Sequence, residues 1–183
     1  SDMQQRIFMI DARNVIDEFK NLPHEQIVSE LNERSSSLEI AIENLTRDYN
    51  MGTIVRSANA FGVRKIHIIG SRQWNKRGAM MTDKYLEVFY HQNVGLFVSS
   101  MNESNKRIVC VDNVKHSQPL SGTKLQQNDV LVFGAEGPGI SDEMLKNGAI
   151  TVEIEQFGST RSINVGVAAG IVMYEWLRQR KLT

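Results

Sequence analysis

The chain contains 183 residues, of which 41% are apolar and 23% are charged. This length and composition are typical of a single globular domain that buries its own core without disulfides or metals. No run approaches the roughly 18 consecutive apolar residues that a membrane-spanning helix needs, so we expect no membrane association and a cytoplasmic protein. Lys and Arg together number 21, as do Asp and Glu. Any nucleic-acid-binding surface must therefore be a local patch.

The cysteine and histidine residues give no sign of a metal or redox site. Cys110 is the single cysteine, so it cannot form an internal disulfide, and its apolar, β-branched neighbours predict a buried strand. The four histidines show neither paired spacing nor a nearby cysteine. The sequence therefore predicts no metal site.

Short apolar, β-branched runs alternate with helical patterns along the chain. This alternation predicts an α/β fold with a mostly parallel, six-stranded sheet that helices cover on both faces. We expect the strands at residues 38–45, 65–69, 87–90, 107–112, 130–133 and 149–154.

Helices are predicted between these strands from apolar spacing and from the glycines that follow them. We expect them at residues 52–61, ended by Gly62, at residues 93–101, and at residues 141–147, followed by Gly148. The longest helix is the last. Its apolar residues keep a helical period and Ser162 can serve as its N-cap, so we expect it to run from Ser162 to about Arg180.

Residues 1–35 precede the first expected strand and are predicted to form an N-terminal extension to a main domain of residues 36–183. The first three residues lack the pattern of a signal peptide, and we expect them to be the remnant of a tag. Pro23 comes shortly before an apolar helical pattern, which predicts a short helix that begins at this proline.

Residues 44–62 run from a strand end into a helix. In parallel α/β sheets, ligands gather at the carboxyl ends of the strands, where Asn44 and Asn50 are expected to lie. Their amides can bind ligands or merely fix the turn. Arg56 follows within the helix, where its guanidinium can hold a phosphate in a bidentate manner or be a plain surface cation.

The next stretch is a buried strand that breaks into a loop with Gly134, Gly137 and Gly139 before a helix that Ser141 can cap. The glycines allow a close approach to a ligand, although they also suit a plain connection between strand and helix. The Lys and hydroxyl residues of a P-loop are missing, as is the dinucleotide fingerprint. Glu136, inside the turn, can bind an amino group or order the loop.

Residues 154–170 join the last strand to the last helix. Ser162, Gly166 and Gly170 recur every four positions and predict a strip poor in side chains, on which another backbone or a flat ligand can lie. Interior glycines destabilise a helix by about 1 kcal/mol each relative to alanine. We therefore expect a packing requirement at both glycines.

Taken together, these three stretches resemble the motifs of the SpoU/TrmH branch of the knotted RNA methyltransferases, in the family's order. The resemblance extends from Glu39 to the C-terminus. It implies an S-adenosylmethionine-dependent enzyme that methylates a ribose 2′-hydroxyl of tRNA or rRNA. It also implies a homodimer, with the RNA site shared across subunits, and a deep C-terminal trefoil knot, which is an exception among folds.

The resemblance assigns a role to positions in all three motifs. The implied catalytic residues are Asn50, Arg56, Glu136, Ser162 and Asn164, and the implied cofactor-binding residues are Gly134, Glu136, Ile154, Ile163 and Ser162. One departure is the sequence Ser-Ile-Asn-Val-Gly at residues 162–166, where the family often has Ser-Leu-Asn-Val-Ser. This change keeps the polar pair but alters local packing.

A short segment after the second expected strand contains Arg72, Trp74, Lys76 and Arg77, so that three cations flank an aromatic ring. Such a segment can hold phosphates and stack on an unpaired base. We expect it to contact RNA together with Arg56, and the alternative is a solvated loop.

Two other classes of function stay open on the sequence. One is a non-catalytic RNA-binding module that keeps the fold, binds RNA and transfers no methyl group. The other is a dinucleotide-dependent enzyme, which the α/β pattern allows but the missing Gly-x-Gly-x-x-Gly fingerprint opposes.

Overall fold

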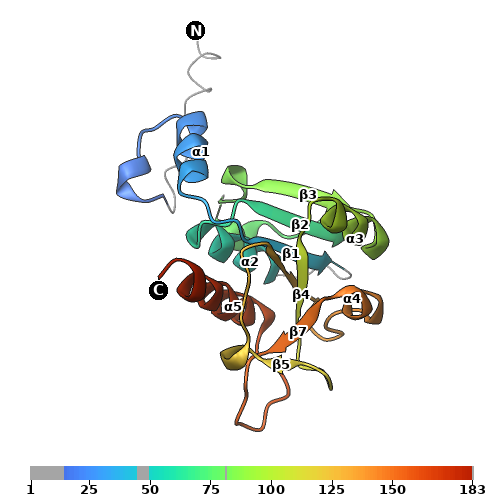
Figure 1. Cartoon of the computed structure of the whole chain (residues 1–183). Helices are drawn as coiled ribbons and strands as arrows, with labels where there is room; N and C mark the ends of the chain where they lie inside the picture. The colour runs from blue at the N-terminus through green and yellow to red at the C-terminus, as the bar shows by residue number, and fades with distance from the viewer. Residues whose placement is uncertain (1–14, 45–49, 81, 183) are drawn as a thin grey trace.

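The computed structural model describes residues 15–44, 50–80 and 82–182. Its centre is a seven-stranded sheet in the order β3-β2-β1-β6-β4-β7-β5, and neighbouring strands pair in parallel throughout (Figure 1). The strands are β1 (Glu39–Asn44), β2 (Lys65–Gly70), β3 (Glu87–His91), β4 (Arg107–Val111), β5 (Gln118–Pro119), β6 (Asp129–Phe133) and β7 (Ile150–Glu153). Since all strands run in one direction, their carboxyl ends lie along one edge of the sheet.

Helices cover both faces of this sheet, which confirms the predicted α/β architecture (Figure 1). The helices are α1 (His24–Glu33), α2 (Asn50–Ala60), α3 (Val94–Glu103), α4 (Asp142–Asn147) and α5 (Val165–Arg180), with short 3-10 helices η2 (Asp17–Phe19), η3 (Arg77–Ala79), η4 (Thr82–Tyr85) and η5 (Leu120–Gly122). The core under α2 and α5 includes Trp176, and the core under α3 and α4 includes Phe97 and Cys110. Each helix pair therefore closes one side of the sheet.

The buried strands explain why the sequence predicts them well. All six residues of β1 and all five of β6 are buried, because these strands lie at the middle of the sheet and are covered on both faces. The predicted strand and helix ends lie within two residues of the observed ones, apart from the start of α5. The predicted end of the first strand, Leu45, lies outside the described residues.

The predicted number of six strands is wrong. The additional strand, β5, has two residues, both exposed, and pairs with β7 at the edge of the sheet. A segment this short has no room for an alternating pattern of apolar residues, so it leaves no signal in the sequence.

The predicted N-cap of the last helix is also wrong, because α5 begins at Val165 and its N-cap is Asn164. The Asn164 side chain accepts hydrogen bonds from the backbone N–H groups of Gly166 (2.9 Å) and Val167 (3.2 Å). Serine and asparagine are both strong N-cap residues. Two such residues close together leave the sequence undecided about which one begins the helix.

The N-terminal part packs on the main body through α1 and η2, and the helix predicted after Pro23 is present as α1. Phe19 and Ile27 are buried, and the His24 ring stacks on Tyr85 of η4 with ring centroids 5.4 Å apart. Within the described residues, no helix combines the length and the apolar character that crossing a membrane requires.

A buried polar network ties β1 to β2 and β4. Glu39 accepts a hydrogen bond from His67 Nε2 at 2.8 Å and pairs with Lys106 Nζ at 2.6 Å. Burial opposes ionisation of Glu39, but the hydrogen bonds and charges of His67 and Lys106 outweigh it and hold the pKa of this carboxyl below its ordinary value.

We predict that this network contributes to stability in acid. Because the pKa of Glu39 is lower in the folded chain than in the unfolded one, its contribution is present above the unfolded pKa of about 4.5 and is lost as the pH falls through the folded pKa. Glu39→Gln should therefore lower the free energy of unfolding near neutral pH by on the order of 1–3 kcal/mol and give a shallower loss in acid. Urea unfolding between about pH 3 and pH 7 measures both. Identical pH profiles for the variant and the parent would contradict the prediction, and the exposed Glu143→Gln serves as the control.

Candidate active site

Three connections leave the carboxyl edge of the sheet close to one another. β1 leads towards α2, β6 leads into the glycine-rich loop before α4, and β7 leads into residues 154–164 before α5. β1 and β6 are neighbours in the sheet, and only β4 separates β6 from β7. The three stretches that the sequence singles out therefore meet at the edge where ligands bind in open parallel sheets.

One residue from each stretch joins a hydrogen-bonded cluster at this edge, which we call the amide–carboxylate cluster (Asn50, Glu136 and Asn164). Asn50 Nδ2 donates to Glu136 Oε2 at 2.9 Å. Asn164 Nδ2 donates to Asn50 Oδ1 at 3.0 Å and to Glu136 Oε1 at 3.4 Å. The structure thus brings together three of the five predicted catalytic residues.

The cap of α5 determines how the cluster is oriented. Asn164 Oδ1 accepts the two backbone N–H groups that begin the helix, so its amide nitrogen must face the cluster. Asn50 Oδ1 then accepts from Asn164, which leaves Asn50 Nδ2 to donate to Glu136. The chain of donors ends on a carboxylate. Glu136 and Asn164 are exposed and Asn50 is half-buried, so the cluster is accessible to a ligand.

The glycine-rich loop that presents Glu136 is a tight turn. Ala135 and Gly139 form an antiparallel bridge, and a Cβ atom on Gly134 would lie 2.2 Å from the backbone carbon of Gly139. Gly137 has a φ of 95°, which favours glycine. Glycine is therefore required at these positions by the turn itself, and Glu136 lies at its exposed tip.

The predicted strip of small residues is confirmed at one glycine only. A Cβ atom on Gly166 would lie 3.2 Å from Thr53 Cγ2 and 3.1 Å from Asn164 Oδ1, so α5 and α2 approach closely there. Gly170 has no atom within 4 Å of its Cβ direction among the described residues. Ser162 lies before the helix and is exposed, so it is not part of the strip.

Arg56 lies on a different face of α2 from Asn50. Because each turn of the helix takes 3.6 residues, a separation of six positions places the two side chains about 120° apart around the helix axis. Arg56 is exposed and lines a hollow of about 570 Å³ between the N-terminal part and the main body, together with Arg34, Lys181 and the aromatic rings of Phe19 and Phe61.

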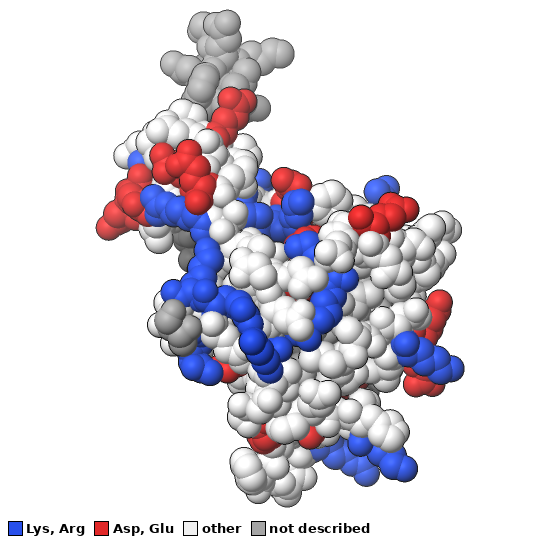
Figure 2. Space-filling model, viewed as in Figure 1, with Lys and Arg blue, Asp and Glu red and all other residues white. Residues whose placement is uncertain are grey.

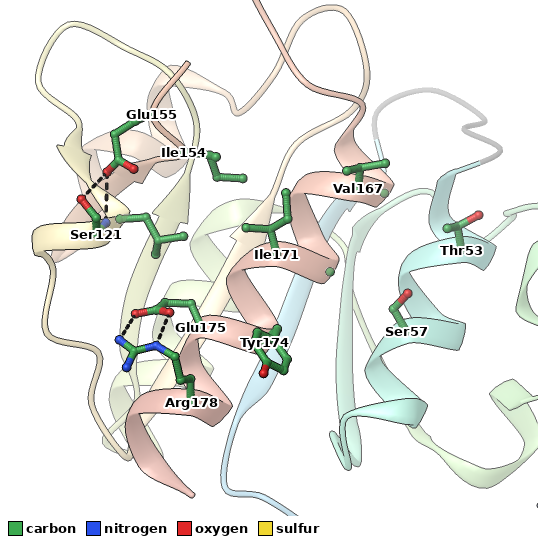
Figure 3. A pocket seen from close by; sticks show the side chains of 13 residues that line it. Thr53, Ser57, Ser121, Ile154, Glu155, Val167, Ile171, Tyr174, Glu175 and Arg178 are labelled. Atoms are coloured by element: carbon green, nitrogen blue, oxygen red, sulfur yellow. Dashed lines mark hydrogen bonds and ion pairs between the residues drawn. The ribbon is translucent and has the colours of Figure 1, made fainter. Parts of the chain in front are cut away.

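A second hollow, of about 790 Å³, opens between α5, α2 and the short segments 120–121 and 154–155 (Figure 3). Val167, Ile171 and Tyr174 of α5 line it, and their side chains are 53%, 40% and 51% exposed. Ile154, one of the predicted cofactor-binding residues, reaches its edge (Figure 3). Gly134 and Ile163 do not line this hollow, so it is not the meeting point of the predicted cofactor residues.

The basic segment at residues 72–77 is held close to the site. Asn44, at the end of β1, donates its Nδ2 to the backbone oxygens of Ser71 (2.6 Å) and Gln73 (3.0 Å). The backbone of η3 lies against the first turn of α2, where a Cβ atom on Gly52 would come within 2.9 Å of the Gly78 backbone. Two backbone segments in direct contact thus place the basic segment beside the start of α2.

The side chains of this segment already form cation–π contacts. The Arg72 guanidinium lies 4.7 Å from the centroid of the Tyr90 ring, and Lys76 Nζ lies 5.5 Å from that of Trp74. Lys76 also pairs with Asp83 at 3.4 Å. Arg72, Lys76 and Arg77 are exposed and Trp74 is half-buried, so the cations are better placed than the indole ring to contact a ligand.

Sequence reasoning missed a polar group beside Ile154. The Oε1 atom of Gln156 is buried and has no hydrogen-bond partner in the described part of the chain. Buried acceptors are rarely left unpaired, so this atom is suited to accept from a ligand. Its position, two residues after a predicted cofactor contact, is the only feature of the sequence that points to it.

Comparison with known proteins identifies the family to which this chain belongs. A sequence model of the SpoU rRNA Methylase family matches residues 37–174. The tRNA (guanosine(18)-2′-O)-methyltransferase of Escherichia coli K12 is 25% identical over 159 residues, which are 85% of this chain and 69% of that protein.

Solved structures agree with this match. The A. aeolicus TrmH/SpoU tRNA modifying enzyme superposes with a TM-score of 0.76 at 25% identity, over 88% of this chain and 86% of the other. The SpoU methyltransferase AviRb from Streptomyces viridochromogenes, solved in complex with the cofactor AdoMet, shares the fold with a TM-score of 0.70 at 24% identity, over 85% of this chain and 65% of the other. Because the family's sequence model spans most of the chain, this protein belongs to the SpoU methylase family.

Proposed function

We propose that this protein transfers the methyl group of S-adenosylmethionine to a ribose 2′-hydroxyl of RNA. The observation that carries this function is the amide–carboxylate cluster, because it joins one residue from each of the three family motifs at the ligand-binding edge of a parallel sheet. The RNA is a tRNA or an rRNA, since the E. coli relative is named for tRNA and the family for rRNA.

The residues at the carboxyl edge fit an adenosine-containing cofactor. The turn at Gly134 brings bare backbone close to the edge, and no described residue lies within 4 Å of the Cβ direction of Gly137. The Oε1 atom of Gln156, unpaired within the described residues, can accept from an adenine amino group or a ribose hydroxyl. We assign cofactor binding to the backbones of Gly134, Ile154 and Ile163, with Ser162 and Glu136 beside them.

When bound, S-adenosylmethionine would supply a methyl group already activated on a sulfonium. The reaction forms a carbon–oxygen bond and breaks a carbon–sulfur bond, S-adenosylhomocysteine is the leaving group, and the hydroxyl proton passes to water. What the protein must supply is position and charge. Asn50 and Asn164 orient the ribose through their amides, and the carboxylate of Glu136 holds both amides in place.

Arg56 supplies the positive charge in this proposal. An arginine side chain keeps its proton in proteins, so it can hold a phosphate in a bidentate manner and, with the RNA site shared across subunits, stabilise negative charge that develops on a ribose oxygen. Its exposed position on α2, with Arg34 and Lys181 lining the same hollow, suits contact with the RNA backbone.

The RNA-binding surface is a local basic patch on a chain without net charge. Figure 2 shows Lys and Arg side chains gathered in a band over α2 and the end of α5, below the N-terminal part. We assign RNA contact to Arg56 and to the segment that contains Arg72, Trp74, Lys76 and Arg77. An unpaired RNA base can stack there on aromatic or guanidinium planes.

We further propose that the protein is a homodimer with the RNA site shared across subunits. The exposed apolar side chains of α5 lie on a helix whose opposite face is buried in the core. A helix that is apolar all round is normally covered on every side. A second copy packed on this face would cover it.

Three finer features of the family's architecture belong to the same proposal. The first is a deep trefoil knot formed by the C-terminal segment. The second is the division into an N-terminal extension, residues 1–35, and a methyltransferase domain, residues 36–183, and the match of the family model to residues 37–174 supports it. The third is a cytoplasmic location, which suits an enzyme that modifies tRNA or rRNA.

Methylation can be tested directly with tritiated S-adenosylmethionine, tRNA or rRNA transcripts, and identification of the labelled nucleotide. We expect a 2′-O-methyl product. Arg56→Ala should reduce turnover by on the order of 10²-fold. The turnover of Arg56→Lys should lie between that of the parent and that of Arg56→Ala, because lysine keeps the charge and loses the planar fork. Unchanged turnover in both variants would rule out an essential role for Arg56. Tight RNA binding by the parent without any label would favour a non-catalytic RNA-binding module.

The two roles of Asn164 can be separated by substitution. Asn164→Ala removes the N-cap of α5 and should destabilise the fold by about 1 kcal/mol, and it also removes the donor to Asn50 and Glu136. Asn164→Ser should restore most of the stability, because serine caps well, while turnover stays as low as in Asn164→Ala.

Asn93 offers a matched control for this pair, because its side chain caps α3 by accepting from Leu96 N at 2.9 Å. Asn93→Ala should lose similar stability and keep full turnover. Denaturant unfolding and methylation rates measured on all the variants separate the capping role of Asn164 from its catalytic role. Recovery of turnover in Asn164→Ser would exclude a catalytic role for the amide.

The basic segment should determine RNA affinity without affecting the cofactor. The triple substitution of Arg72, Lys76 and Arg77 by alanine should weaken RNA binding and reduce the slope of log K against log salt by roughly 0.7–0.9 for each phosphate that these side chains no longer neutralise. Filter binding at several salt concentrations measures the slope. The control removes the same charge at the exposed residues Lys65, Lys124 and Lys146. Equal effects of the two triple variants would mean that only net charge matters.

A further inference from the structure

Two carboxylates hold the glycine-rich loop from opposite sides of the strand that leads into it. β6 lies between β1 and β4 in the sheet. Glu43 is the penultimate residue of β1, and Asp112 directly follows β4. Each neighbouring strand thus sends one acidic side chain to the loop that leaves β6.

Glu43 is 1% exposed and binds the end of the loop with both oxygens. Its Oε1 accepts from the backbone N–H of Ser141 at 2.9 Å, and its Oε2 accepts from the hydroxyl of the same residue at 2.8 Å. The Ser141 hydroxyl in turn accepts from Met144 N at 3.2 Å and so caps α4. Glu43 therefore fixes the point at which the loop becomes a helix.

Asp112 binds the preceding residue. Its Oδ2 accepts from the backbone N–H of Ile140 at 3.0 Å, and its Oδ1 accepts from Asn113 N at 2.8 Å. The same Oδ2 lies 2.7 Å from where a Cβ atom on Gly139 would be, and Gly139 has a φ of 70°. Only glycine fits against this carboxylate, so the acid and the loop sequence are matched.

We propose that Glu43 and Asp112 are positioning residues that clamp residues 134–141 in the shape that presents Glu136 to Asn50 and Asn164. This inference rests on the proposed function for its catalytic consequence. Glycine has more backbone freedom than any other residue, and the bridge between Ala135 and Gly139 fixes only the tip of the loop. Anchoring two successive backbone N–H groups on carboxylates supplies the missing constraint.

The two sites respond differently to the isosteric amide. At position 43, glutamine can accept the Ser141 N–H through its oxygen and donate through its nitrogen to the serine hydroxyl, which has acceptor capacity. At position 112, both oxygens accept backbone N–H groups, so asparagine must point an N–H group at one of these donors. Glu43→Gln should therefore preserve the clamp, whereas Asp112→Asn loses one of the two backbone contacts that hold its side chain and should weaken the clamp.

The test uses Glu43→Gln, Glu43→Ala, Asp112→Asn and Asp112→Ala, with Glu143→Ala on the exposed side of α4 as a control that removes the same kind of charge. Hydrogen exchange in the ligand-free protein measures the protection of the Ile140 and Ser141 amides. Calorimetry measures the Kd of S-adenosylhomocysteine, and methylation at saturating cofactor measures kcat.

We expect faster exchange at these two amides, about tenfold weaker binding of S-adenosylhomocysteine and a lower kcat in Glu43→Ala, Asp112→Ala and Asp112→Asn, since an unpaired buried N–H group is costly. In Glu43→Gln, the Kd and kcat should remain within about threefold of the parent values. Glu143→Ala should behave like the parent. Equal behaviour of Glu43→Gln and Asp112→Asn, or unchanged exchange in both alanine variants, would overturn the proposal.

Hydrogen exchange keeps the clamp distinguishable from the proposed function. If the parent protein binds no S-adenosylhomocysteine but the variants show the expected exchange pattern, the clamp stands and the methyltransferase assignment fails. If the parent binds S-adenosylhomocysteine and methylates RNA but exchange is the same in every variant, the methyltransferase assignment stands and the clamp fails.

Discussion

Every group at the candidate site depends on the parallel direction of the strands. Because β1, β6 and β7 all end at the same edge, residues from three distant parts of the sequence meet without any long excursion of the chain. Asn50 and Asn164 are separated by 114 positions and still share a hydrogen bond. An antiparallel pairing of any of these strands would move its connection to the other edge and remove one member of the cluster. The parallel direction of the strands is thus what allows the amide–carboxylate cluster to form.

The site is built from groups that also stabilise the fold. Asn164 caps the last helix with its oxygen and joins the amide–carboxylate cluster with its nitrogen. Gly166 lets that helix approach α2, and the tight turn at Gly134 directs Glu136 outwards. Backbone contacts orient Asn164 and Glu136, and the hydrogen bond to Asn164 orients Asn50, so little freedom is left to be lost when a substrate binds. This is the preorganisation that catalysis by positioning requires.

The sequence predicts the parts of the structure that follow a local pattern. The fully buried strands appear as apolar runs, and α2 to α4 have clear apolar spacing, so their positions are nearly right. The predicted start of α5 is wrong because Ser162 and Asn164 are equally good caps. Only the packing of α5 against α2 selects Asn164. β5 has too few residues for a pattern. The contact of Glu43 with the loop cannot be predicted from the sequence, because its partner Ser141 lies 98 positions away and no local pattern links the two residues. Likewise, only the hydrogen bonds of the folded chain reveal that Gln156 has an unpaired oxygen.

The close contact of Gly52 with Gly78 has a mechanical consequence. Among the described residues, the backbones of η3 and of the first turn of α2 touch directly at this point. A nucleic acid bound at residues 77–79, as proposed, would press on the turn that begins at Asn50. Its binding affinity and the position of Asn50 would then be coupled through these two backbones.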